Sequence, residues 1–200
     1  MRFNINQIYN KNNVLIKLLD YKGSTVNCVD LNLINKNDLK TFNSFKSDKR
    51  KLEFYHLRVL WNSFNTEQNI LYQPSGKPYL QNGFLSMTHS HQQVVIAYSL
   101  NKEVGVDIEM ISNKIEKVKH KFLHPNDNYE SLKDLTQLWT IKEAVYKLFD
   151  GDNDFFMDHI EIKDLSKNIA EINYQSFKLK SKFESFNINS DFIVTLATEK

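Results

Sequence analysis

The stretch V-G-V-D-I-E, residues 104–109, is a short run rich in valine and isoleucine that carries two carboxylates. Such a run is typical of a buried strand. Side chains on a strand alternate between its two faces, so Asp107 and Glu109 share one face. The apolar side chains of Val106 and Ile108 share the other. The acidic face is either a polar outer face or half of a metal site, and the rest of the chain has to distinguish the two.

The composition is that of a globular chain without a strong charge. Its 200 residues are enough for one domain or two small halves, and 41% of them are hydrophobic. The net charge of +2 is too small to indicate nucleic-acid binding. The single cysteine, Cys28, excludes an internal disulfide and is typical of a reducing compartment. No signal-peptide core and no apolar run near the ~18 residues of a membrane span is found, so we expect a cytoplasmic protein that binds no membrane.

The periodicity of apolar residues predicts an α+β chain made of strands, helices and a central hairpin. Helical periodicity is found at 38–64, 114–123 and 131–149. Strand-like runs are found at 14–19, 26–33, 94–100, 104–109, 159–163, 172–177 and 191–198, and a loop at 73–79. This order suggests two similar halves, residues 1–100 and 101–200, that meet near residue 100.

The two central runs, 94–100 and 104–109, are joined by only three residues, which predicts an antiparallel hairpin. In that hairpin Asp107 lies across from Ala97, and Glu109 lies across from Val95. The preceding segment S-M-T-H-S-H, residues 86–91, then lies just past the end that carries the carboxylates. We therefore expect His89 to approach whatever the two carboxylates hold.

The helical segment L-W-T-I-K-E-A-V-Y-K-L-F, residues 138–149, has two distinct faces. The expected buried face consists of Leu138, Ile141, Val145 and Leu148. The opposite face carries Trp139, Glu143 and Lys147, spaced by four residues. Glu143 and Lys147 form either a surface ion pair worth about 0.3–0.5 kcal/mol or part of a site. Trp139 is unusual on a polar face, and we expect another part of the molecule to cover it.

The loop Q-P-S-G-K-P-Y-L, residues 73–80, holds Lys77 between a glycine and a proline. These neighbours fix the path of the loop, so Lys77 is either a defined phosphate contact or an incidental lysine in a turn. The glycine spacing of a P-loop and its following serine or threonine are missing.

Taken in order, G-K-P at 76–78, S-M-T-H-S at 86–90, G-V-D-I-E at 105–109 and W-T-I-K-E-A-V-Y-K at 139–147 resemble the 4′-phosphopantetheinyl transferases. The resemblance is to the surfactin-synthetase-activator type, in which two related halves are fused around an active-site cleft. It runs from about Phe42 to about Gly151. It implies a monomer, because the cleft that smaller relatives form between subunits would be internal.

The resemblance assigns roles to individual residues. It implies that Mg²⁺ is bound by the carboxylates of Asp107, Glu109 and Glu143, which suits a hard cation that prefers oxygen ligands. It implies coenzyme A contacts from Arg50, Gly76, Lys77, Pro78, Thr88, His89 and Ser90. His89 matches a histidine that contacts the diphosphate. Arg50 aligns more loosely, and Lys49 and Lys51 compete for its role.

The implied reaction moves 4′-phosphopantetheine from coenzyme A to a serine of an apo acyl or peptidyl carrier protein and releases adenosine 3′,5′-bisphosphate. Glu143 is the candidate general base, and Lys147 is the candidate partner of the leaving phosphate. Two alternatives remain open. One is a homologue that binds coenzyme A or a carrier without turnover. The other is a nucleic-acid module that uses K-S-D-K-R-K at 46–51, which the balanced charge disfavours.

The chain also departs from the family pattern. His91 stands where better-known members have glycine, and it is either a further phosphate contact or a residue at a strand start that faces water. Phe122 and Leu123 either face the carrier or pack in the core. Lys36 and Lys40 do not fall on the positions expected for contacts to the 3′-phosphate.

Overall fold

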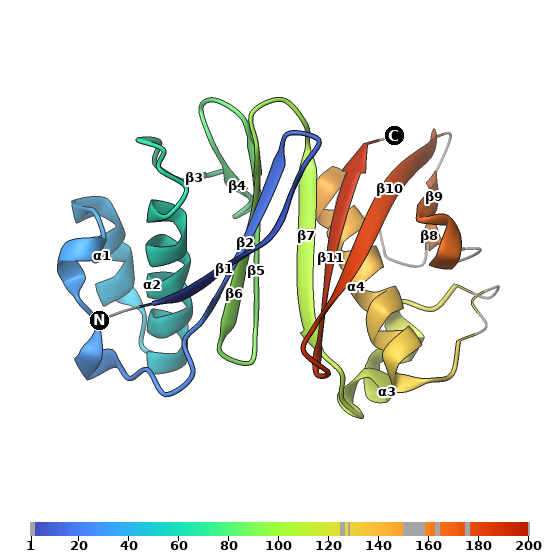
Figure 1. Ribbon diagram of the computed structural model, residues 1–200, viewed down its shortest axis with the longest axis horizontal. Helices are drawn as coiled ribbons and strands as arrows, with labels where there is room; N and C mark the ends of the chain where they lie inside the picture. The colour runs from blue at the N-terminus through green and yellow to red at the C-terminus, as the bar shows by residue number, and fades with distance from the viewer. Residues whose placement is uncertain are drawn as a thin grey trace.

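The structure, a computed structural model, describes residues 3–124, 127, 129–149, 159–162, 165–174 and 177–199 (Figure 1). The first part of the chain forms β1 (Asn4–Lys11), β2 (Val14–Asp20), α1 (Lys36–Ser44), α2 (Asp48–Asn62), β3 (Leu71–Tyr72), β4 (Pro78–Tyr79), β5 (Phe84–Ser90) and β6 (Gln93–Ser99). The second part forms β7 (Val104–Met110), α3 (Lys114–Val118), α4 (Leu132–Phe149), β8 (Ile160–Glu161), β9 (Ile169–Tyr174), β10 (Phe177–Ile188) and β11 (Phe192–Glu199). The predicted α+β class is therefore confirmed.

The strands form two larger antiparallel sheets and a small hairpin. The order is β1-β2-β6-β5 in the first sheet and β7-β11-β10-β9-β8 in the second, and β3 pairs with β4. One apolar cluster lies between α2 and the first sheet, a second lies between α4 and the second sheet, and a third joins the two sheets. The described part of the molecule thus has helices on the outer face of each of two stacked sheets, as Figure 1 shows.

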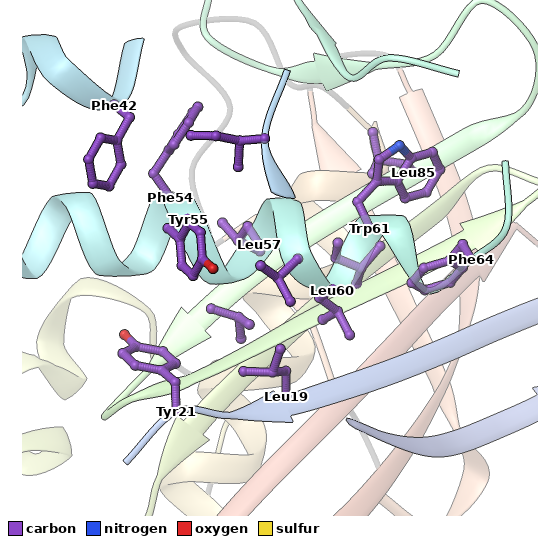
Figure 2. Packing of buried hydrophobic residues seen from close by; sticks show 14 of the residues in the cluster. Leu19, Tyr21, Phe42, Phe54, Tyr55, Leu57, Leu60, Trp61, Phe64 and Leu85 are labelled. Carbon is purple, nitrogen blue, oxygen red and sulfur yellow. The ribbon is translucent and has the colours of Figure 1, made fainter. Parts of the chain in front are cut away.

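Helix α2 anchors the first sheet. Its start is capped by Ser47, whose hydroxyl accepts a hydrogen bond from the Arg50 amide at 3.5 Å. Figure 2 shows Leu60 and Trp61 of this helix packed toward Leu19 of β2 and Leu85 of β5. The prediction of helix over 38–64 is confirmed for α1 and α2 and is wrong only at the break between them, where α1 ends at Ser44 and extended backbone at Phe45 precedes the new cap.

The predicted strand at 26–33 is also wrong. This segment forms two short 3₁₀ turns, Val26–Cys28 and Leu31–Leu33. The Asp30 carboxylate accepts a hydrogen bond from the Asn32 amide at 3.0 Å, a local interaction that competes with strand pairing.

The predicted hairpin of 94–100 with 104–109 does not form, although both strands exist. β6 already pairs with β2 along one edge and with β5 along the other, so it has no free edge for β7. β7 instead pairs with β11 in the second sheet. Asp107 is therefore opposite Thr195 of β11, and the expected position of Asp107 across from Ala97 is wrong.

β5 and β7 lie beside each other as the edges of the two sheets, and side chains connect them. The Ser86 hydroxyl accepts a hydrogen bond from the Val106 amide at 3.0 Å. The Thr88 hydroxyl donates to Asp107 at 2.8 Å, and the Ser90 hydroxyl donates to Glu109 at 2.9 Å. Side chains of alternate residues in β5 thus form hydrogen bonds with polar groups of β7 that have no backbone partner in β5.

The C-terminal strands follow the prediction in part. The segments 159–163 and 191–198 overlap β8 and β11, while 172–177 covers the end of β9 and the start of β10 and includes two residues outside the described ranges. β10 was not predicted as a strand of its own. No helix in the described part of the chain is long and apolar enough to span a membrane.

Candidate active site

Helix α4 brings Glu143 toward β7 because glycine at position 105 permits close contact between the two elements. A Cβ atom at Gly105 would meet the backbone oxygen of Ala144 at 1.9 Å, which no other residue type could tolerate without movement. The predicted buried face of the helix is confirmed, since Leu138, Ile141, Val145 and Leu148 are at most 2% exposed.

Asp107 lies at the centre of the site and is only 4% exposed. Its Oδ1 atom accepts hydrogen bonds from the Thr88 hydroxyl at 2.8 Å and from the Lys147 ammonium at 2.6 Å. Within the described residues its buried Oδ2 atom has no hydrogen-bond partner. The interpretation of this strand face as a solvent-exposed polar face is therefore wrong for Asp107.

The other two carboxylates share this environment. Burial raises the pKa of Glu109, and the charge of Asp107 raises it further, while the Ser90 hydroxyl opposes the shift. Burial raises the pKa of Glu143 to about 7; Lys147 opposes this shift, and Asp107 and Glu109 add to it. Glu143 is therefore half-buried and is affected by the charges of both strand carboxylates.

Lys147 interacts with β7 and not only with its own helix. Its ammonium donates to the carboxylate of Asp107 at 2.6 Å and to the backbone oxygen of Val106 at 3.2 Å. Its side chain is 27% exposed, so the pair is shielded more than a surface ion pair.

The donor set suits a divalent cation. The charges of Asp107 and Glu109 both act on Glu143, and one buried oxygen of Asp107 lacks a partner among the described residues. Oxygen-only ligands of this kind favour a hard ion such as Mg²⁺. In the described ranges, however, no three histidine, cysteine, aspartate or glutamate side chains stand together in metal-binding geometry.

A second group of polar side chains lies between α2 and β5. Arg50 Nη1 is 3.2 Å from Glu53 Oε2 and 3.2 Å from His89 Nε2. Burial lowers the pKa of His89, Glu53 opposes that shift, and Arg50 and two lysines add to it.

These residues border a cavity of about 200 Å³. Of the residues that the sequence assigned to coenzyme A, the cavity is lined by Arg50, Gly76, Pro78, Thr88 and His89. Its apolar lining includes three aromatic residues that the sequence analysis did not assign to the site, Phe45, Phe54 and Tyr72. Because these residues are aromatic and lie next to the assigned loop and helix in the sequence, their residue type could have indicated a place in the site.

Lys77 and Ser90 were also assigned to coenzyme A, but they do not line the larger cavity. Lys77 borders a neighbouring cavity of about 130 Å³, together with Lys147 and Pro78. Ser90 is buried, and its hydroxyl donates to Glu109. Both hydroxyl-bearing residues of the T-H-S segment thus contact the strand carboxylates in this structure.

Two open alternatives are decided by the structure. His91 lies in the turn between β5 and β6, not at a strand start, with φ 44°, and it is exposed. A residue in the left-handed region favours glycine, so histidine in place of glycine costs backbone strain here, and its exposed side chain agrees with the alternative that faces water. Phe122 is fully buried, and its ring packs edge-on against that of the half-buried Trp139, with 5.1 Å between the ring centroids, so Phe122 is a core residue.

Comparison with known proteins matches the second part of the chain. Residues 103–197 match the family model described as "4'-phosphopantetheinyl transferase superfamily". The chain is also similar to the 4'-phosphopantetheinyl transferase gsp of Aneurinibacillus migulanus, with 34% identity over 91 residues. This match covers 40% of the chain and 38% of the relative, so the chain spans well under half of the relative's length. The matched family region contains Asp107, Glu109, Glu143 and Lys147, whereas the cavity residues of α2 and β5 lie outside it.

Proposed function

We propose that the protein transfers 4′-phosphopantetheine from coenzyme A to a serine of an apo acyl or peptidyl carrier protein, because residues 103–197 match the family model of the 4′-phosphopantetheinyl transferase superfamily. The observation that carries this proposal is the contact of Lys147 of α4 with Asp107 of β7 at 2.6 Å, next to a cavity lined by Arg50 and His89. The charges of Asp107 and Glu109 also act on Glu143, which supports these three carboxylates as the ligands of Mg²⁺. A bound Mg²⁺ would offset the charge of the diphosphate.

Coenzyme A would lie across both cavities. The nucleotide would occupy the larger cavity, where aromatic side chains offer stacking surfaces and Arg50 and His89 offer contacts to phosphate. The turn at Gly76, with φ 87°, brings the loop backbone to the cavity edge, a conformation that glycine adopts at little cost. Lys77 and Lys147 border the adjacent cavity and would attract the diphosphate from its other side.

The transfer would be a single displacement at phosphorus. The serine oxygen of the carrier forms a bond to the β-phosphorus, and the bond from that phosphorus to the bridging oxygen breaks. Glu143 takes the serine proton, a role that its pKa of about 7 suits near neutral pH. Lys147 neutralises the oxygen that leaves with adenosine 3′,5′-bisphosphate.

The proposal extends to the organisation of the molecule. The protein would act as a cytoplasmic monomer whose halves, residues 1–100 and 101–200, enclose the cleft between them. Residues from both parts line one of the cavities, Lys77 from the first and Lys147 from the second, which supports an internal cleft.

A transfer assay tests the proposal. The protein is incubated with coenzyme A, Mg²⁺ and several apo carrier proteins, and the carriers are weighed by mass spectrometry. We expect the mass of one phosphopantetheine group to be added to at least one carrier. The absence of any adduct, with a known transferase active on the same carriers, would refute the proposal.

A second candidate, binding of coenzyme A without turnover, is favoured by one observation. The Lys147 ammonium already occupies the Asp107 carboxylate at 2.6 Å, where it can compete with a cation. Calorimetry with coenzyme A separates the two candidates, because a binding protein would show heat of binding but would yield no adduct in the transfer assay.

A further inference from the structure

A buried carboxylate lies in the cavity where an anion is expected. Glu53 of α2 is only 4% exposed, and it lines the larger cavity together with Arg50 and His89. A negative charge in this place opposes the binding of a diphosphate. Its presence therefore needs a physical reason, and hydrogen bonding to its neighbours supplies one.

Glu53, Arg50 and His89 form a closed triangle of contacts between α2 and β5. Glu53 Oε2 is 3.2 Å from Arg50 Nη1, and this same Nη1 is 3.2 Å from His89 Nε2. The third side is the distance of 3.5 Å between His89 Nδ1 and Glu53 Oε1. The exposed Lys49 adds a longer contact of 3.8 Å to Glu53 Oε1.

The triangle fixes the tautomer of His89. An arginine side chain has only donors, so His89 Nε2 must accept the hydrogen bond from Arg50. The proton of the neutral imidazole is then on Nδ1, which faces the Glu53 carboxylate. The carboxylate thus interacts with both cavity residues, while the Arg50 side chain remains 57% exposed and can direct its other N–H groups to a ligand.

We propose that Glu53 is a positioning residue that holds Arg50 and the Nδ1-protonated form of His89 in place for the diphosphate of coenzyme A. This role rests on the proposed function. A long arginine side chain loses much conformational freedom when it binds phosphate, and a buried partner reduces that loss before the ligand arrives. Glu53 acts through these two residues and does not touch the diphosphate itself.

Whether the loss of the Glu53 charge weakens or strengthens binding tests the positioning role of Glu53. Glu53→Gln keeps the shape of the side chain but removes its charge, and Asp48→Asn removes the same charge from an exposed position of the same helix. Calorimetry with coenzyme A and with inorganic pyrophosphate gives the dissociation constants. We expect Glu53→Gln to weaken binding about tenfold, the scale of one lost charge-assisted hydrogen bond, and Asp48→Asn to leave binding unchanged or slightly tighter. Unchanged or tighter binding by Glu53→Gln would overturn the proposal, because simple removal of a negative charge predicts that result.

Nitrogen NMR of His89 in the free protein separates this inference from the proposed function. We expect the Nδ1–H tautomer in the wild type and a mixture with the Nε2–H tautomer in Glu53→Gln. If the wild type binds no coenzyme A, the proposed function fails. The tautomer of His89 can still be measured in that case, and it shows whether Glu53 controls His89. An identical tautomer in both proteins would overturn the role of Glu53. If Glu53→Gln does not fold, Glu53→Asp draws the carboxylate back from His89 and is expected to change the same two measurements.

Discussion

Asp107 has a different environment at each of its carboxylate oxygens. Oδ1 is held by Thr88 and Lys147, while the buried Oδ2 has no hydrogen-bond partner among the described residues. A buried oxygen left in this way costs stability unless a ligand satisfies it. At the scale of single residues, the Asp107 carboxylate is therefore better satisfied when the protein has a ligand bound than when the protein is free.

The raised pKa of Glu143 leads to a prediction for stability. The folded protein retains the Glu143 proton up to a pH of about 7, its raised pKa, whereas a glutamate of the unfolded chain releases the proton near the ordinary pKa of 4.5. Stability that the neutral Glu143 contributes is therefore lost as the pH rises through this window. The quantity to compare is the difference in unfolding free energy between Glu143→Gln and the metal-free wild type. We expect this difference to shift in favour of the variant by on the order of 1–3 kcal/mol between pH 5 and pH 8. Urea unfolding at both pH values measures this, and an equal difference at both would contradict it.

Lys147 gives a prediction for catalysis. We expect Lys147→Ala to lower kcat about 100-fold, because it removes the cation that pairs with Asp107 and neutralises the leaving phosphate. Lys133→Ala, on an exposed position of the same helix, is the matched control and should leave kcat unchanged. Activity of Lys147→Ala within twofold of the control would show that Lys147 is only a structural or surface residue.

At the scale of elements, Gly105 sets the distance between β7 and α4. An alanine here would place its Cβ 1.9 Å from the backbone oxygen of Ala144, so the helix must move away. We expect Gly105→Ala to destabilise the protein by about 3 kcal/mol or more and to weaken cation binding, since Glu143 moves with the helix. Thermal unfolding and metal titration measure both effects, and stability within about 0.5 kcal/mol of the wild type would refute the role of Gly105.

The hydroxyl groups of β5 give a second prediction at this scale. Thr88→Val preserves the shape of the side chain but leaves the Asp107 carboxylate with one donor fewer. We expect a loss of about 1–2 kcal/mol in the free energy of unfolding, because the carboxylate is buried. Thr88→Ser retains the hydroxyl, and it should recover most of the loss if the hydrogen bond is its cause. Equal losses in both variants would instead assign the effect to the missing or altered methyl groups.

The sequence predicts local elements better than it predicts their pairing. The buried face of α4 follows from its 3.6-residue periodicity, and the alternation along 104–109 correctly places Val106 and Ile108 in the core between the sheets. The partner of each strand depends on which sheet edges are already occupied, a property of the whole molecule that no local pattern contains. This is why the hairpin of 94–100 with 104–109 was wrong, although both strands were located correctly.

The candidate site shows the same limit. The ordered motifs located the carboxylates and the cavity loop, because those residue types carry the chemistry in any setting. Glu53 was not found, since its importance comes from burial beside His89, a residue 36 positions further along the chain. A glutamate three residues after Arg50 on a helix reads as an ordinary surface ion pair until its exposure is known.

At the scale of the whole molecule, a shared core joins the two sheets. Val95 of β6 and Val194 of β11 belong to the same buried cluster, and the Tyr9 hydroxyl donates across the sheets to Glu184 at 2.8 Å. We therefore expect a single cooperative unfolding transition, with equal calorimetric and van't Hoff enthalpies. Two resolved transitions would show that the two parts of the chain fold independently and would contradict this account of their interface.

Metal titration tests the convergence of the carboxylates most directly. Mn²⁺ is an oxygen-seeking, paramagnetic substitute for Mg²⁺, and its binding in the presence of coenzyme A is followed by electron paramagnetic resonance. We predict one tight site in the wild type that is lost in each of Asp107→Asn, Glu109→Gln and Glu143→Gln. Undiminished Mn²⁺ affinity in Glu143→Gln would contradict a site shared by β7 and α4.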